Sequence, residues 1–292
     1  MKPFELGRKL GRLVAVALVL TSCERERDSA TPRPLNQIPM PQLRQMLKGF
    51  DGDWRPDSDK EHGIQPPPSE KGIPSGAQLI PLVGPEKFCV RGMSLPQAIS
   101  SRRSARTFSK SAITLEELSF LLWATQGVTG EITGDEAHET TRLRAAPSAG
   151  GRYPLETYIA VRAVDGLAPG LYRYLPNSHQ LHLILTDNDL SLRMQKLCYG
   201  LPLVADASVV FVWAVVPSRT EWKYTYTSHR MIAMEAGHVC QNLYLAATSS
   251  GLGVSALCSY HQPSLDALIG VDGQNEFVIY LACVGRPGVT EK

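Results

Sequence analysis

The sequence lacks the short motifs that mark several common classes of enzyme. Its 292 residues contain no CxxC pair, no GxGxxG fingerprint and no P-loop. His229, Glu235 and His238 lie near one another in the sequence, but their spacing does not form HExxH, so we expect no metal site. Ser104 and Ser148 lie outside any GxSxG elbow. These absences argue against a metalloenzyme, a dinucleotide-binding Rossmann domain and a serine hydrolase.

The sequence also lacks a strong charge of either sign. The formal net charge is +2, with 43% hydrophobic and 20% charged residues, as is usual for a globular enzyme with a sizeable core. Residues 1–22 hold four basic residues and one acidic residue, so removing them would change the net charge from +2 to −1. A nearly neutral chain gives no basis for nucleic-acid binding.

No apolar run is long enough to span a bilayer as a helix, but the N-terminus has the pattern of an export signal. Basic residues precede a short apolar run, 13–20. The run ends at Leu20-Thr21-Ser22-Cys23, which resembles a bacterial lipobox. We expect residues 1–22 to be a lipoprotein signal peptide, with the lipid on Cys23 and the protein tethered in the cell envelope. An ordinary secretory signal and a wrongly assigned start remain alternatives.

Few regularly spaced apolar residues follow the signal. Residues 23–77 are polar and proline-rich, which predicts a tether followed by a loosely packed arm. Leu43, Met46, Leu47 and Phe50 lie at helical spacing and predict a short helix within this region.

Residues 78–292 have the dense, mixed pattern of a folded domain. Ser94 and Thr114 each begin a predicted helix, and Thr114 and Glu117 form a capping box. A long helix is predicted over 228–250. Strands are predicted over 157–162, 170–174, 179–185, 208–216 and 277–284. The pattern favours an α+β fold, in which helices pack on a sheet without a regular βαβ repeat. Cys240, Cys258 and Cys283 lie in apolar runs and are expected to be buried.

The first motif with chemical potential follows the helix that begins at Ser94. Arg102, Arg103, Ser104 and Arg106 place three guanidiniums and a hydroxyl within five residues. The planar fork of arginine matches phosphate oxygens, so the run predicts a site for a mononucleotide phosphate. A solvated basic turn is the alternative.

The second motif consists of small residues directly before a predicted strand. Pro147, Ser148, Ala149, Gly150 and Gly151 allow the backbone to approach a flat ligand, and free amides can donate to the ligand's edge. A plain glycine turn would have the same sequence.

Two further motifs flank the long helix. Lys223 and Tyr224, upstream of it, could supply a general base and a proton carrier, or could be surface residues. Gly251 and Gly253 follow the helix and could simply end it with a left-handed residue. Arg286, after the last predicted strand, could return to the phosphate cluster.

Taken in order, these motifs resemble those of the nitroreductase superfamily, and within it the SagB-type, or thiazole/oxazole-forming, dehydrogenases. The resemblance rests on the runs RRSARTF, ITLEELSFLLWATQGVTG, PSAGGRYPLETYIAV and HRMIAMEAGHVCQNLYLAATSSGLG, and it extends from about residue 78 to 287. It implies an α+β sandwich with a central, mostly antiparallel sheet, and a homodimer with flavin mononucleotide (FMN) at the subunit interface.

The resemblance also implies roles for single residues. Arg102, Ser104 and Arg106 would bind the phosphate, ribityl chain and pyrimidine edge of FMN, and Arg286 would return to the phosphate. The segment from Pro147 through Ser148, Ala149 and Gly150 to Gly151 would line the isoalloxazine ring, with backbone from Gly251 and Gly253 nearby. Lys223 and Tyr224 would remove a proton.

The expected function is dehydrogenation of a C–N or C–C bond in a small molecule or peptide, with hydride passing to flavin N5. The first alternative is an NAD(P)H-dependent reductase of nitro or quinone compounds. The second is a flavin-free envelope lipoprotein that binds a ligand. Azoline oxidases of the SagB branch work in the cytoplasm beside a cyclodehydratase, so an exported chain argues against peptide heterocycle formation.

Overall fold

The computed structural model describes residues 38–48, 57–89, 92–133 and 140–288. The chain divides into two compact units, Met1–Lys48 and Gly49–Lys292. In the first unit, α2 (Met40–Leu43) continues into a 3-10 turn, Arg44–Leu47, which confirms the short helix predicted there. The predicted signal peptide, Cys23 and Phe50 lie outside the described residues, so the lipoprotein signal stays a prediction.

The second unit is built on a seven-stranded sheet in which every neighbouring pair is antiparallel. Its spatial order is β1 (Leu79–Pro81), β6 (Gln180–Thr186), β5 (Gly170–Leu175), β4 (Leu155–Val161), β7 (Val209–Val215), β9 (Phe277–Gly285) and β8 (Gly253–Leu257). The central strands β4 and β7 are buried at every residue, as expected for strands covered on both faces. A separate hairpin pairs β2 (Val128–Ile132) with β3 (Thr141–Arg144).

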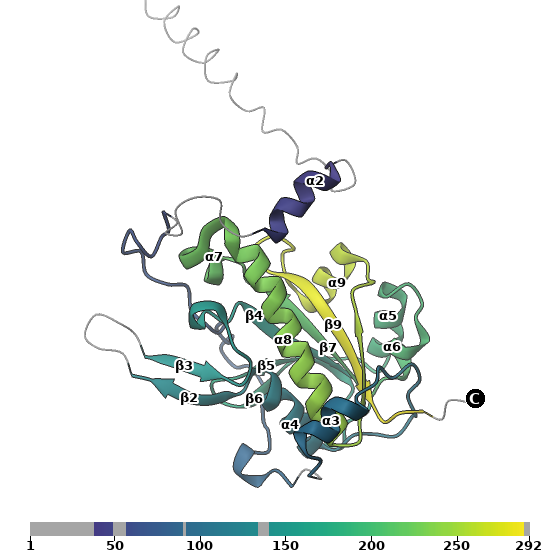
Figure 1. The fold of residues 1–292 in the computed structure, drawn as a ribbon. Coiled ribbons are helices and arrows are strands. Elements are labelled where there is room, and N and C mark those ends of the chain that lie inside the picture. The colour runs from purple at the N-terminus through teal and green to yellow at the C-terminus, as the bar shows by residue number, and fades with distance from the viewer. Residues whose placement is uncertain (1–37, 49–56, 90–91, 134–139, 289–292) are drawn as a thin grey trace, which may run out of the picture. The chain divides into compact units, whose positions relative to one another are not determined.

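Helices cover both faces of the sheet, and α8 (Ser228–Ser249) runs along one of them (Figure 1). On that face, α4 (Leu115–Gln126) and α8 pack against Phe211 and Trp213 of β7. The alternate residues Val210 and Val212 face the second core, with α5 (Leu190–Leu197), α6 (Pro202–Asp206) and α9 (Gln262–Ile269). The α+β sandwich predicted from the sequence is therefore confirmed.

The strongest local signals gave the right elements. The predicted Thr114 capping box begins α4, and Ser94 begins α3 (Leu95–Ser101) as predicted, where it also forms a capping box with Gln97. The predicted long helix and the five predicted strands correspond to α8, β4, β5, β6, β7 and β9. The sequence interpretation missed the hairpin, the short edge strands β1 and β8, and the helices α5, α6, α7 (Ser218–Tyr224) and α9. It was wrong about Cys258, which is exposed because it follows the end of β8, whereas Cys240 and Cys283 are buried.

The arm is more firmly held than its composition suggested. Residues 57–77 belong to the second unit, and three arginines of the sheet, hairpin and glycine loop donate to their backbone carbonyls. The acceptors are Pro67, Ser69 and Gly72, at 2.9, 2.8 and 2.7 Å from Arg152, Arg144 and Arg173. The sequence did not reveal this packing because hydrogen bonds from arginine to backbone carbonyls do not require regularly spaced apolar residues in the arm. Among the described residues, no helix has both the length and the apolar character needed to cross a bilayer.

Candidate functional site

The basic motif lies beside the edge of the sheet, near the C-terminal end of α8. Ser104 forms a parallel bridge with Val254 of β8, and the Ala105 amide donates to the Val254 carbonyl at 2.9 Å. The Ser109 amide donates to the carbonyl of Arg286 at 2.9 Å. The segment after α3 therefore runs between β8 and the chain that follows β9. This arrangement brings together the backbones of Arg102, Ser104, Arg106, Gly253 and Arg286.

Tyr244 of α8 organises the polar side chains of this cluster. Its hydroxyl lies 3.2 Å from the Ser104 Oγ and accepts a hydrogen bond from the Ala256 amide at 3.0 Å. The Arg102 guanidinium lies over the Tyr244 ring, 5.2 Å from its centroid, and Arg106 Nη1 donates to Ser255 Oγ at 3.3 Å. Both guanidiniums contact neutral groups in these interactions, so their positive charge remains available to an anion.

Arg286 reaches the same end of the sheet but already has a carboxylate partner. Its Nη2 atom donates to both carboxylate oxygens of Glu117, each at 3.0 Å. Glu117 also accepts from the Thr114 amide in the capping box of α4. A phosphate at Arg286 would therefore compete with Glu117. A cavity of about 530 Å³ opens here, lined by these three residues together with Cys89, Glu116, Ser250 and Gly251.

The two glycines after α8 have structural roles. Gly251 has a φ of +72°, which a residue with a side chain rarely adopts, and it follows the end of the helix. A Cβ atom on Gly253 would lie 2.6 Å from the Ala105 Cβ, so this glycine lets the basic motif approach β8. Both therefore support the arrangement of the basic motif beside β8 through the backbone.

The second predicted motif forms a tight loop near the other end of α8. Gly150 and Gly151 have φ values of +60° and +64°. A Cβ atom on Gly150 would lie 2.7 Å from the Tyr224 hydroxyl and 2.8 Å from Lys223 Nζ. The side chains of Lys223 and Tyr224 therefore lie directly against the glycine loop. The structure thus brings together two motifs that are about seventy residues apart in the sequence.

A buried ion pair fixes the helix that carries these two side chains. Arg219 of α7 donates to the carboxylate of Glu156 on β4 at 2.5 Å and to the Tyr153 carbonyl at 3.1 Å. Arg219 and Glu156 are each 3% exposed. Breaking a buried pair is costly because one charge is left without compensation. The position of α7 relative to the sheet is therefore strongly determined.

Glu235 is a site residue whose role the sequence interpretation missed, having weighed it only as a metal ligand. It is 3% exposed and accepts hydrogen bonds from the Ser148 side chain and the Ala149 backbone. Burial raises the pKa of this carboxyl to about 7, against the opposing effects of these hydrogen bonds and of Arg144. Ser148 Oγ in turn accepts from the Tyr153 amide at 2.8 Å. A lone acidic residue on the apolar face of a predicted helix was the available signal.

The histidines near Glu235 do not form a metal site with it. His229 Nε2 lies 3.0 Å from the Glu221 carboxylate of α7, and His238 is exposed. Among the described residues, no three His, Cys, Asp or Glu side chains are grouped as metal ligands.

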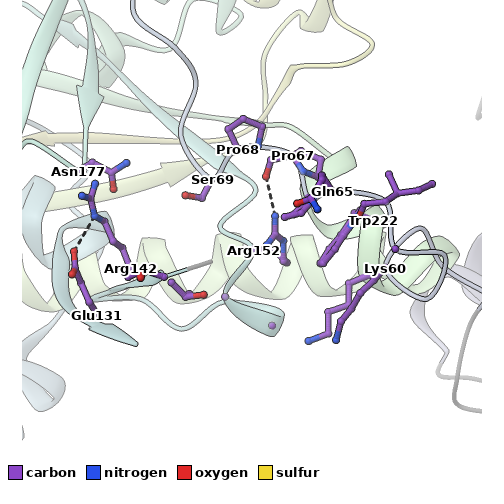
Figure 2. A pocket seen from close by; sticks show the side chains of 18 residues that line it. Lys60, Gln65, Pro67, Pro68, Ser69, Glu131, Arg142, Arg152, Asn177 and Trp222 are labelled. Atoms are coloured by element: carbon purple, nitrogen blue, oxygen red, sulfur yellow. Dashed lines mark hydrogen bonds and ion pairs between the residues drawn. The ribbon is translucent and has the colours of Figure 1, made fainter. Parts of the chain in front are cut away.

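A cavity of about 670 Å³ adjoins the glycine loop (Figure 2). Gly150, Gly151 and Lys223 line one part of it. The arm lines another part with residues 63–69, and the β2–β3 hairpin contributes Arg142. The sequence interpretation gave the arm no part in a site.

The phosphate cluster and the glycine loop lie at opposite ends of α8. Glu235 contacts the loop, whereas the basic motif contacts Tyr244 and β8 follows Ser249. At 1.5 Å per residue, Tyr244 and Ser249 are about 14 and 21 Å from Glu235 along the helix axis. Figure 1 shows α7 near one end of α8 and α3 near the other. The two groups of predicted cofactor residues therefore do not meet within one chain.

Comparison with known proteins places this architecture in a family. The sequence pattern of the nitroreductase family matches residues 99–286. This range contains both half-sites, namely the basic motif at 102–106 and the glycine loop at 147–151. The chain belongs to the nitroreductase family. MJ1384 of Methanocaldococcus jannaschii, a protein named for the nitroreductases, is 34% identical over 200 residues, covering 68% of this chain and 93% of that protein.

Two further members clarify the relationship. The microcin B17-processing protein McbC of Escherichia coli is 28% identical over 113 residues, covering 37% of this chain and 42% of McbC. This match agrees with the likeness to the SagB branch noted from the motifs. A solved structure from Ralstonia eutropha, also named for the nitroreductases, superposes with a TM-score of 0.56 at 25% identity, covering 77% of this chain and 99% of the other. The chain is therefore a nitroreductase-family oxidoreductase.

Proposed function

We propose that this nitroreductase-family protein is an FMN-dependent dehydrogenase that works as a homodimer. The observation that carries the proposal is the separation of the two half-sites, by about 14–21 Å along α8. The phosphate and the ring of one flavin lie closer together than this. A two-fold axis that pairs the α8 helices of two chains in opposite directions would place the phosphate cluster of one against the glycine loop of the other.

The exposed face of α8 supports this pairing. Met234 is 49% exposed, and Gly237, His238 and Gln241 continue the same face of the helix. Leu95 and Ile99 of α3, which packs on α8, are 61% and 57% exposed. Met234, Leu95 and Ile99 are thus large apolar side chains on α8 and α3 that an interface could bury.

The residues present fit the two chemical ends of FMN. The guanidiniums of Arg102 and Arg106 contact neutral groups, so their positive charge is available to the phosphate. Gly150 and Gly151 present backbone without side chains, as a planar ring requires. When bound, FMN supplies a hydride acceptor that a second substrate can reoxidise.

We assign to Lys223 and Tyr224 the movement of the proton that accompanies hydride transfer. Both reach Gly150, and Lys223 Nζ lies 5.3 Å from the centroid of the Tyr224 ring. In the proposed dehydrogenase one of them removes a proton from the carbon or nitrogen next to the hydride-donating carbon. The substrate is a small molecule or a peptide with an oxidisable C–N or C–C bond.

A reductase function is the second candidate, because the relative MJ1384 is named for the nitroreductases. In that case NAD(P)H would reduce the flavin and a nitro or quinone compound would reoxidise it. Stopped-flow mixing of the loaded protein with NADH separates the two. Rapid bleaching of the flavin favours the reductase, and no bleaching favours the dehydrogenase.

The test of the cofactor and the dimer uses the chain from Glu24 onward, desalted after incubation with FMN. We expect a bound-flavin absorption spectrum, one FMN per chain and a dimer in analytical ultracentrifugation. The double variant Arg102→Ala/Arg106→Ala should lose the flavin while keeping the circular dichroism of the parent. A colourless, folded parent protein would refute the proposal and favour a ligand-binding lipoprotein.

A further inference from the structure

The arm is a preformed wall of the cavity beside the glycine loop. The Lys60 amide donates to the carbonyl of Trp222 at 3.0 Å, and the Trp222 indole donates to the Ile64 carbonyl at 2.7 Å. Arg152 donates to the Pro67 carbonyl at 2.9 Å and lies over the Trp222 ring, 4.7 Å from its centroid. Trp222 directly precedes Lys223 in the chain. The arm therefore takes its position from the same helix that carries the proposed base.

The charge of this cavity is strongly one-sided. Its lining contains four cationic side chains, Lys60, Arg142, Arg152 and Lys223, and a single carboxylate, Glu131. Glu131 pairs with Arg142 at 3.0 Å, and both side chains are about half exposed. Within the part of the chain that the structure describes, no carboxylate lies within ion-pair distance of Lys60 or Lys223. A cleft lined by charges of one sign raises the local concentration of ligands of the opposite sign.

The same cavity has an apolar side. Three consecutive prolines, 66–68, line it together with Ile64, which is 52% exposed, and Trp222. Figure 2 shows Pro67, Arg152 and Trp222 grouped on one side of the cavity, with Lys60 beside them and Arg142 at the other side. A ligand that satisfies both kinds of lining has an apolar body and a negatively charged group.

We propose that this cavity selects small substrates that carry an oxyanion, a carboxylate or a phosphate, on an apolar body. Lys60 binds the oxyanion, and the apolar body lies between the proline wall and Gly150, beside Lys223 and Tyr224. Lys60 is thus a specificity residue contributed by the arm. The inference rests on the proposed function, because it assigns a substrate class to the same site.

The test measures the binding of three probes by calorimetry on the full chain, with and without FMN. The probes are benzoate, phenyl phosphate and benzamide, the last being a neutral analogue of benzoate. We expect at least one of the two anions to bind about tenfold more tightly than benzamide, since a charge-assisted contact separates them. Lys60→Gln should remove this preference without changing benzamide binding, and Lys60→Arg should restore it. Lys196→Gln, on the exposed side of α5, is the matched control and should change nothing.

The outcomes separate this inference from the proposed function. Equal affinity for benzamide and both anions, or a preference that survives Lys60→Gln, would overturn the inference. The second result would assign the anion to another cation, either in the same cavity or near Ser104. Because the chain itself lines the cavity, probe binding is measurable without flavin. Loss of flavin retention with a Lys60-dependent preference intact would refute the FMN proposal and leave the anion site in place.

Discussion

Replacing Glu235 with glutamine should remove a loss of stability that the parent protein undergoes as pH rises. Burial raises the pKa of this carboxyl from 4.5 to about 7. The folded state therefore binds the proton more tightly than the unfolded state, and the parent protein loses stability as pH rises between these two values. A difference of two to three pKa units corresponds to about 3 kcal/mol, an upper bound for a group that is not fully enclosed.

The glutamine variant removes this loss but has a cost of its own. Its amide stays neutral at every pH and can still accept from Ser148 and the Ala149 backbone. However, an amide cannot release its N–H hydrogens as a carboxyl releases its proton. One N–H group therefore always faces the buried loop, at a cost of about 1 kcal/mol. We therefore expect Glu235→Gln to be about as stable as the parent at pH 5, where the parent has already lost about 1 kcal/mol, and more stable than the parent by about 2 kcal/mol at pH 8.

Urea denaturation at fixed protein concentration, in half-unit steps between pH 5 and pH 8.5, measures this difference. Holding the concentration constant matters because dimerisation would shift the apparent stability. Glu86→Gln is the matched control, since its side chain is 67% exposed and should give a profile parallel to the parent. Parallel profiles for Glu235→Gln and the parent would refute the reasoning, because they would show that Glu235 does not titrate differently in the two states.

Three other changes test separate parts of the structure. Gly150→Ala should destabilise the fold by about 1–2 kcal/mol, because φ at this position is +60°. It should also lower turnover about a hundredfold by displacing Lys223 and Tyr224, with flavin retention as the control readout. Arg102→Ala and Arg106→Ala should each weaken FMN binding at least tenfold in fluorescence titrations, and an unchanged affinity in both would contradict the phosphate assignment. Cys23→Ala should abolish the incorporation of radiolabelled fatty acid and move the protein to the soluble fraction, whereas labelling that persists would exclude Cys23 as the lipid site.

The parts of the fold that the sequence predicts are those with strong local signals. The run 208–216 is continuously apolar and forms the central strand β7, and the Thr114 capping box begins α4 where expected. The strand β8 has no such signal, because it gains its partners only from β9 and the basic motif. Gly270 ends α9 in the left-handed conformation. Because α9 itself was not predicted, there was no reason to interpret this glycine as the end of a helix.

The candidate site likewise has parts that the sequence predicts and parts that only the structure shows. Arginine and glycine runs mark the two half-sites in the sequence, but their separation along α8 depends on the whole fold. The contact of Lys223 and Tyr224 with Gly150 joins motifs that spacing alone cannot relate. Their expected role came from resemblance to a family. Glu235 was passed over because an acidic residue in a helix has many possible explanations until its burial is known.

Arg152 explains why the glycine loop, the arm and the proposed base form one unit. It follows Gly151 directly, its Nε donates to the Arg219 carbonyl of α7 at 3.1 Å, and its Nη2 holds the arm at Pro67. A change in the position of the arm therefore acts on α7 through the same guanidinium that supports the loop. Substrate selection by the arm and proton transfer by Lys223 are thus expected to be coupled, so variants of the arm should alter both KM and kcat.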